Sequence, residues 1–168
     1  MLIFEEKQRF RQWWIWLLFA FLNVNAWIAI FSQLILHKPD GNNPMSDSGL
    51  IITAIMMFLF SLFFFSMNMK TRIDKESISL KFFPFHRNFK KYEFKDIKYC
   101  FVRKYSPILE YGGWGLRGIS NNIAFNVSGN TGLQIELNNG KKILIGTQNA
   151  DMLKKFLEEN GLQKGGIF

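Results

Sequence analysis

The sequence predicts a two-helix transmembrane hairpin followed by a mainly β domain that ends in one helix. Three observations support this prediction. Two uncharged apolar runs, at residues 13–36 and 50–69, flank a short loop rich in Pro, Gly, Asn and Asp. After residue 70, apolar and polar residues alternate, which is the period of a half-buried strand. Residues 150–160 then show the apolar spacing of an amphipathic helix. We therefore expect an N-terminal flank and anchor in residues 1–69 and a β domain in residues 70–168.

Each apolar run is long enough to cross a bilayer as a helix. About 20 helical residues span a hydrocarbon core of ~30 Å. Trp13, Trp14 and Trp16 stand at the start of the first run, where aromatic rings favour the head-group level. The first run is too long for the core of a cleaved signal peptide, and no small-residue cleavage site follows it. Both runs are apolar all round, which argues against a hairpin of soluble amphipathic helices.

The polar residues within the runs are interpreted as packing contacts. Asn23 and Asn25 lie in the middle of the first run. Such amides form hydrogen bonds between helices, within the hairpin or within a homo-oligomer. The alternative is a path for a substrate or ion, but intramembrane charge is the stronger sign of transport and neither run holds a charged residue.

Basic residues predict which side of the membrane the β domain occupies. The connecting loop holds one of them, Lys38, whereas three lie on each of the outer flanks: Lys7, Arg9 and Arg11 before the first run, and Lys70, Arg72 and Lys75 after the second. The positive-inside rule then places both termini in the cytoplasm.

The net charge of +8 also predicts the kind of partner. From residue 70 onward there are 17 Lys and Arg against 9 Asp and Glu, so this part of the chain holds an excess equal to the whole net charge. A basic domain beside a bilayer is attracted to anionic lipids by about 1 kcal/mol for each Lys or Arg near the surface. Nucleic acid is the other usual partner of a basic protein, but we do not expect it for a domain tethered to a membrane.

The strands of the β domain follow from alternation. Ile78, Leu80 and Phe82 mark one strand. The next two strands lie within residues 89–103. Their apolar residues are expected on one shared face: Tyr92, Phe94, Ile97, Tyr99 and Phe101. A strand at 133–137 and a return strand from residue 142 enclose Asn139-Gly140, a strong signal for a type I′ hairpin turn. The helix at 150–160 is followed by Gly161, a favourable residue just past a helix end. We expect about six or seven antiparallel strands and this one helix.

Strands followed by one terminal helix resemble the pleckstrin-homology-like (PH-like) superfold. Three phrases are similar to a family of small bacterial membrane proteins with a PH-like domain: Glu110-Tyr-Gly-Gly-Trp-Gly-Leu-Arg117, Ala124-Phe-Asn-Val-Ser-Gly-Asn-Thr-Gly-Leu-Gln-Ile-Glu-Leu137 and Lys141-Lys-Ile-Leu-Ile-Gly-Thr-Gln148. The resemblance covers roughly residues 70–160. It implies a PH-like fold and a bacterial inner (cell) membrane, and it brings no established ligand or catalytic residue.

The glycine-rich loop is the first candidate for a functional site. Residues 113–118 have the spacing G-x-G-x-x-G, but a dinucleotide site needs a helix after this loop and no helical period follows. We interpret the loop as presenting Tyr111, Trp114 and Arg117 to a ligand or a membrane surface. The alternative is a packed corner of the sheet.

A stripe of lysines is the second candidate. Lys91, Lys95, Lys98 and Lys104 are expected on the face opposite the apolar set. They could form a patch for lipid phosphates, although such stripes are more often solvated faces.

Catalytic chemistry is not expected. His37, His86 and Cys100 lie far apart in the sequence, without the spacing of a zinc site, and no nucleophile has an evident base beside it. We therefore predict no catalytic, cofactor-binding or metal-binding residues. The expected function is a membrane-anchored interaction module that binds a protein partner or anionic lipid head groups at the cytoplasmic face. The alternative is an accessory subunit of a larger membrane complex, assembled through the hairpin.

Overall fold

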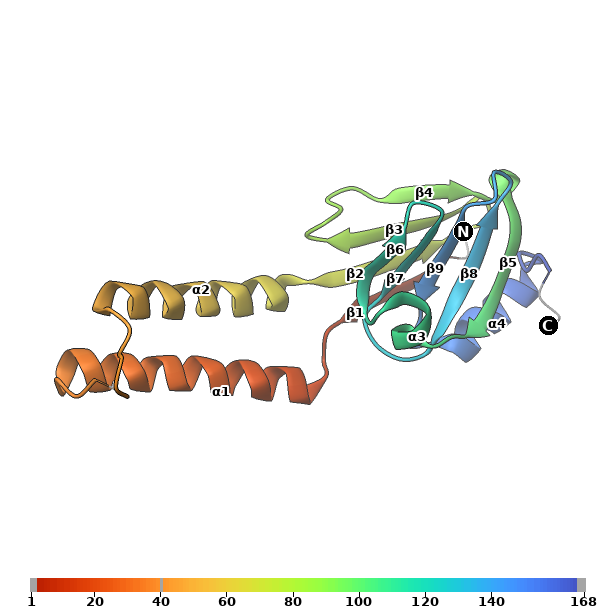
Figure 1. Cartoon of the computed structure of the whole chain (residues 1–168). Helices are drawn as coiled ribbons and strands as arrows, with labels where there is room; N and C mark the ends of the chain where they lie inside the picture. Colours follow the sequence, from red (N-terminus) through yellow and green to blue (C-terminus); the bar gives the residue numbers. More distant parts are fainter. Residues whose placement is uncertain (1–2, 40, 166–168) are drawn as a thin grey trace. The chain divides into compact units, whose positions relative to one another are not determined.

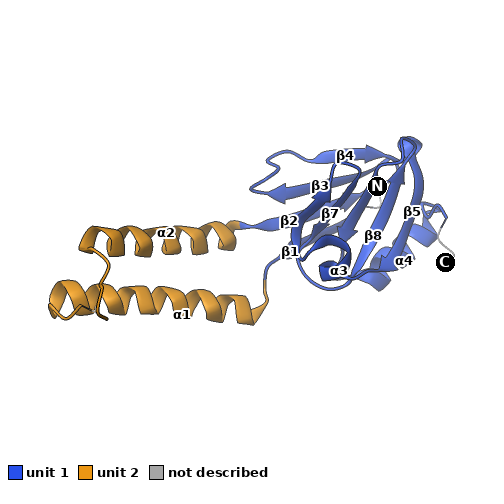
Figure 2. Cartoon of the chain, viewed as in Figure 1, with its two compact units in different colours: residues 1–10, 67–168 blue, residues 11–66 orange. Residues whose placement is uncertain are grey.

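The chain forms two compact units in the computed structural model, which describes residues 3–39 and 41–165 (Figures 1 and 2). The hairpin unit consists of residues 11–66. The β unit consists of residues 1–10 and 67–168. The N-terminal residues, expected as a flank of the anchor, therefore belong to the β unit, and the hairpin unit is an insertion between its first two strands.

The hairpin unit contains two helices that are long and apolar enough to span a membrane. Helix α1 (Trp13–Ile30) continues into a π-helical turn, η1 (Phe31–Ile35), and helix α2 comprises Asp47–Ser66. Ala54 is the one fully buried side chain of α1 and α2 within the described residues, so these are not core helices of a globular domain. Helix α2 lies three residues earlier than the predicted run at 50–69. The reason is that Met67 and Met69 are buried in the β unit, where they extend the apolar run beyond the helix.

The two helices of the hairpin contact each other through aromatic rings and one amide. Edge-on contacts join Phe19 to Phe60 and Phe64, at centroid distances of 5.8 and 5.3 Å. One turn after Phe19 on α1, the Asn23 side chain donates a hydrogen bond of 2.9 Å to Ser61 Oγ on α2. This polar contact fixes which faces of the two helices meet.

The β unit holds nine strands in two sheets, counted over the described residues. The first sheet has the order β1-β2-β3-β4: β1 (Phe4–Arg9), β2 (Asn68–Ile73), β3 (Ser77–Phe83) and β4 (Lys90–Glu93). The second has the order β5-β8-β9-β7-β6: β5 (Ile97–Lys104), β6 (Gly115–Ile119), β7 (Asn122–Asn126), β8 (Thr131–Leu137) and β9 (Lys142–Gly146). Short turns η2 (Phe94–Asp96) and α3 (Pro107–Tyr111) connect strands, and α4 (Ala150–Glu159) follows the last one. The expectation of six or seven antiparallel strands was wrong in number, and β7 pairs with β9 in parallel.

Strand β1 is absent from the sequence prediction because its inward side chains are mostly polar. Glu6 and Gln8 are buried beside Phe4. The Glu6 carboxylate accepts hydrogen bonds from Thr147 Oγ1 at 2.7 Å and from the backbone N–H of Gln148 at 2.8 Å. The Gln8 side chain donates to the Gly146 carbonyl at 2.7 Å. These bonds join β1 to the end of β9, far from it in the sequence.

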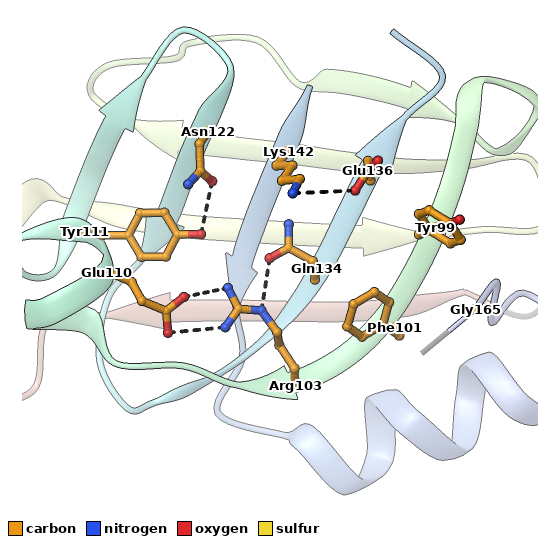
Figure 3. A pocket seen from close by; sticks show the side chains of 10 residues that line it. All are labelled: Tyr99, Phe101, Arg103, Glu110, Tyr111, Asn122, Gln134, Glu136, Lys142 and Gly165. Atoms are coloured by element: carbon orange, nitrogen blue, oxygen red, sulfur yellow. Dashed lines mark hydrogen bonds and ion pairs between the residues drawn. The ribbon is translucent and has the colours of Figure 1, made fainter. Parts of the chain in front are cut away.

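The core lies between the two sheets and α4. Figure 3 shows the five-stranded sheet with the four-stranded sheet behind it. The Phe82 and Phe125 rings meet edge-on at 6.5 Å and link the sheets. Other fully buried side chains come from both sheets and from the helix: Ile73, Ile78, Leu80, Leu133, Ile135, Ile143, Ile145, Leu153 and Leu157. One face of each sheet is thereby left for other contacts.

The buried bonds of Glu6 predict a stability effect. The substitution Glu6→Ala leaves the buried hydroxyl of Thr147 and the part-buried N–H of Gln148 without their acceptor, so the free energy of unfolding should fall by about 2–3 kcal/mol. Denaturant unfolding of the full chain in mild detergent measures this change. The matched control is Glu5→Ala, which removes only an exposed ion pair with Arg72 and should cost less than about 1 kcal/mol. Equal effects would contradict the role of Glu6.

Candidate functional site

A groove on the outer face of the five-stranded sheet is the candidate site (Figure 3). Its volume is about 650 Å³, within the range of small-ligand pockets. The lining side chains come from four strands, from α3 and from the C-terminal segment: Tyr99, Phe101, Arg103, Glu110, Tyr111, Asn122, Gln134, Glu136, Lys142 and Gly165. We call this site the groove.

An irregularity in β5 turns three of these side chains toward the groove. The register with β8 shifts between Ile97 and Tyr99, and such a bulge reverses the alternation of the residues after it. Ile97 and Cys100 are both buried, whereas Tyr99 is exposed. The expectation that Tyr99 and Phe101 share the apolar face of Ile97 was therefore wrong. They line the groove together with Arg103.

Cross-strand pairs arrange the outer face of this sheet in rows. One row runs through Tyr99, Glu136, Lys142 and Asn122, and the next through Phe101, Gln134, Leu144 and Ala124. In the row beyond them, a Cβ atom at Gly146 would lie 2.9 Å from Asn126 Cβ and 3.4 Å from the hydroxyl of Tyr105. That end of the face therefore needs glycine and is filled by close packing, and Leu144 and Ala124 of the second row are fully buried in a cluster with Tyr105 and Tyr111.

Arg103 and Glu110 form the polar wall of the groove. Arg103 donates to both carboxylate oxygens of Glu110, at 2.7 and 3.3 Å, and its Nε donates to Gln134 Oε1 at 3.0 Å. Glu110 also accepts from the backbone N–H of Ser106 at 2.8 Å. The hydrogen bond from Arg103 lowers the pKa of the Glu110 carboxyl. Glu110 therefore stays ionised at neutral pH, and its bonds hold α3 beside β5.

Helix α3 places Tyr111 in the same wall, on the same side of the groove as Glu110 (Figure 3). The helix begins after Ser106, whose hydroxyl caps the N–H of Leu109, and ends at Gly112 with φ 70°. Tyr111 donates a hydrogen bond of 3.2 Å to Asn122 Oδ1, and its ring meets Tyr105 edge-on at 6.1 Å. Burial raises the pKa of the Tyr111 hydroxyl, so it remains a donor.

The charges in the groove balance. Lys142 Nζ lies 3.9 Å from Glu136 Oε2, and Arg103 pairs with Glu110. With two positive and two negative side chains, the groove has no excess charge. Its aromatic and hydrogen-bonding surface suits a neutral or mixed-charge ligand better than a multiply charged anion.

The C-terminal segment forms the end of the groove beside Tyr99. The backbone of Lys164 exchanges two hydrogen bonds with Cys100, at 2.8 and 3.0 Å. Gly165 follows with φ 72°, and a Cβ atom there would come within 2.6 Å of the Tyr99 ring. A glycine at this position therefore lets the chain pass directly over the aromatic ring.

Of the three residues predicted in the glycine-rich loop, Tyr111 lines the groove. Trp114 instead donates from its indole nitrogen to the Gly129 carbonyl at 3.0 Å, and Arg117 Nε donates to the Trp114 carbonyl at 3.0 Å. The sequence indicates that no helix follows the G-x-G-x-x-G spacing of residues 113–118. In the structure, Gly115–Ile119 form strand β6. The Trp114 bond joins the glycine-rich loop to the loop between β7 and β8, and neither Trp114 nor Arg117 lines the groove.

The four predicted lysines are not gathered in one patch. Lys91 lies in β4 of the four-stranded sheet, and Lys95 lies in η2, where it pairs with Glu93 at 2.6 Å. Lys98 and Lys104 lie near opposite ends of β5. Six residues of strand separate them by about 20 Å. Each is exposed.

The two asparagines predicted to pack in the hairpin make different contacts. Asn23 bonds to Ser61 on the second helix, as described above. Asn25 is exposed, and its side chain donates to the Phe21 carbonyl of its own helix at 2.7 Å. Asn25 thus takes no part in the contact between α1 and α2.

Burial shifts the pKa values of Cys100 and His86, which lie in the β unit. Cys100 is buried, and this burial raises the pKa of its thiol to about 12. Burial, together with the charge of Lys90, lowers the pKa of His86. Within residues 3–39 and 41–165, no three His, Cys, Asp or Glu side chains gather as metal ligands would.

The groove residues other than Tyr111 were not predicted. Phe101 and Arg103 were missed because the sequence does not show the β5 bulge. A weaker signal existed in β8, where Gln134 and Glu136 alternate with buried Leu133 and Ile135. Comparison of the sequence with family models and with curated proteins gives no match. The groove is therefore interpreted from its own geometry.

The Arg103–Glu110 pair predicts a pH dependence. The pKa of Glu110 is lower in the fold than in the unfolded chain, where it is near 4.5. At pH values above 4.5, the ionised carboxylate therefore stabilises the folded protein. This contribution is lost as the pH falls through the folded pKa. Glu110→Gln should therefore lower the Tm of the full chain at pH 7, and the difference from wild type should shrink below pH 4.5. Glu158→Gln, in an exposed pair with Lys154, is the control. A constant difference across pH would contradict the prediction.

Proposed function

We propose that this chain is a membrane-anchored interaction module with a PH-like β unit that binds an extended segment of a partner protein. The groove is the observation that supports this proposal most. It is large enough for a ligand, it lies on an outer sheet face, and its charges balance. The module is non-catalytic and needs no cofactor, and nucleic acid is not its partner.

The chemistry of the groove matches that of a polypeptide. Tyr99 and Phe101 offer aromatic surface for an apolar side chain. Asn122 and Gln134 offer amide groups that can bond to a peptide backbone. The pairs Arg103–Glu110 and Lys142–Glu136 can each exchange an internal contact for one with a charged side chain of the ligand. A single compact anion would use only half of these groups.

The anchor supports the membrane part of the proposal. Both helices of the hairpin expose apolar side chains along their length, which is favourable in lipid and costly in water. Three basic residues precede the first helix and three follow the second, which favours a cytoplasmic position for both termini by the positive-inside rule: Lys7, Arg9, Arg11, Lys70, Arg72 and Lys75. The two sheets with the final helix α4 support a PH-like unit, and the resemblance to bacterial proteins favours the inner membrane of a bacterium. The parallel pair β7–β9 departs from the antiparallel order that we expected of that superfold.

Asn25 favours a second candidate function, that of an accessory subunit in a larger membrane complex. Its amide is exposed on α1 near the middle of the span, and the described residues give it a bond only to its own helix. A hydrogen bond between membrane helices contributes roughly 0.6–2 kcal/mol. A helix of another protein that forms a hydrogen bond with Asn25 would stabilise the complex by that amount.

Site-specific photocrosslinking tests the groove. We expect benzoylphenylalanine in place of Phe101, in the full chain within its host membrane, to form a discrete adduct with a polypeptide, because the side chain faces the groove. Mass spectrometry identifies the crosslinked segment. The same reporter in place of exposed Met152 on α4 should not form this adduct, and Gln134→Ala should weaken it. Adducts with lipid alone, or the same adduct from position 152, would contradict the proposal.

Native gels test the second candidate. Asn25→Leu should remove a stoichiometric partner from the detergent-extracted complex, since it deletes the outward amide and preserves the apolar helix. Val24→Leu is the matched control and should retain the partner. If the Asn25→Leu complex keeps its size, assembly does not depend on this amide.

A further inference from the structure

We propose that the outer face of the four-stranded sheet binds anionic lipid head groups through a row of three lysines, Lys7, Lys70 and Lys81. This inference rests on the membrane-anchor part of the proposed function, and it is independent of the groove. It assigns the lipid contact to residues that differ from the stripe predicted from the sequence. We call these three residues the lysine row.

The lysine row follows from strand register. Lys7 of β1 lies directly opposite Lys70 of β2, and Lys70 lies directly opposite Lys81 of β3. Side chains opposite each other in antiparallel strands point to the same face, with Cβ atoms about 5 Å apart. Three ammonium groups therefore extend from one line of roughly 10 Å across the sheet.

This arrangement is unfavourable unless an anion compensates it. Like charges directly opposite in a sheet destabilise the pair. Among the described residues, no ion pair joins a carboxylate to any of the three lysines. The nearest acidic residues in β1 are committed elsewhere: Glu5 pairs with Arg72 at 3.2 Å, and Glu6 is buried on the opposite face.

The surroundings of the lysine row add positive charge. Arg9 and Lys91 lie on the same outer face according to the strand register, and both are exposed. Arg72 is on this face too, with its guanidinium 4.9 Å from the centre of the Phe89 ring. Glu93, on β4, pairs with Lys95. The face therefore has a marked basic excess, in contrast to the neutral groove.

The length of the chain keeps the lysine row close to the head groups. Lys70 follows the last residue of α2, Ser66, by four positions, and Lys7 precedes the first residue of α1, Trp13, by six. An extended chain reaches at most about 3.5 Å per residue. The backbone of Lys70 is thus within about 14 Å of the end of one candidate span, and that of Lys7 within about 21 Å of the other. Each lysine that reaches an anionic surface adds to the attraction between the domain and the membrane.

Lysine acetylation in nanodiscs tests the contact. We expect the full chain in discs with phosphatidylglycerol to show several-fold slower acetylation of Lys7, Lys70 and Lys81 than in discs of phosphatidylcholine alone. Mass spectrometry measures each site, and 1 M salt should restore the rates. Lys154 and Lys155 of α4 are internal controls whose rates should not change. Equal rates for the lysine row in the two kinds of disc would overturn the proposal. So would equal protection by inorganic phosphate in neutral discs, since the ligand would then be a soluble anion.

A charge variant gives a second, independent measurement. Lys70→Gln removes the central charge, so in neutral discs its Tm should equal or exceed that of wild type. Anionic discs should raise the Tm of wild type and of the control Lys155→Gln, and should raise that of Lys70→Gln much less. An undiminished rise for Lys70→Gln would overturn the lysine row. The Phe101 adduct should persist in Lys70→Gln, so failure of the lipid contact and failure of the groove are distinguishable.

Discussion

The antiparallel pairing of β1 with β2 is the constraint on which the rest of the structure depends. The chain leaves the β unit at the end of β1 and returns to it at the start of β2, so the inserted hairpin begins and ends at neighbouring strands. A hairpin of two helices satisfies this condition, because the chain returns to the end at which it left. The pairing also brings Lys7 opposite Lys70, and buried bonds from Glu6 and Gln8 hold β1 in register.

The sequence predicts the parts of this fold whose side chains follow a simple period. Continuous apolar residues predict both hairpin helices, alternation predicts most strands, and the spacing of an amphipathic helix predicts the position of α4. The prediction fails where polar residues face inward, as Glu6 and Gln8 do in β1. It also fails where an apolar run passes from one element to the next: Met67 and Met69 extend the run of α2 but belong to the core of the β unit.

The candidate site was harder to predict because its position depends on one irregularity. Without the register shift after Ile97, Tyr99 and Phe101 would face the core, and Cys100 would face outward. Charge counting has a similar limit. It assigns the basic excess to residues after 70, but Lys7 and Arg9 join the same sheet through β1. The fold then separates a charge-balanced face from a strongly basic one, which a count along the chain cannot show.

The short pairing of Lys164 with Cys100 affects how another molecule can approach β5. The free edge of a sheet exposes backbone groups that can accept an additional strand from a second chain. At Cys100 both the N–H and the carbonyl of this edge are already occupied by Lys164. Strand addition along the middle of β5 is thereby blocked by the protein's own C-terminal segment. A molecule that settles next to Tyr99 must then be recognised through side chains, which favours selection by chemical character over generic backbone pairing.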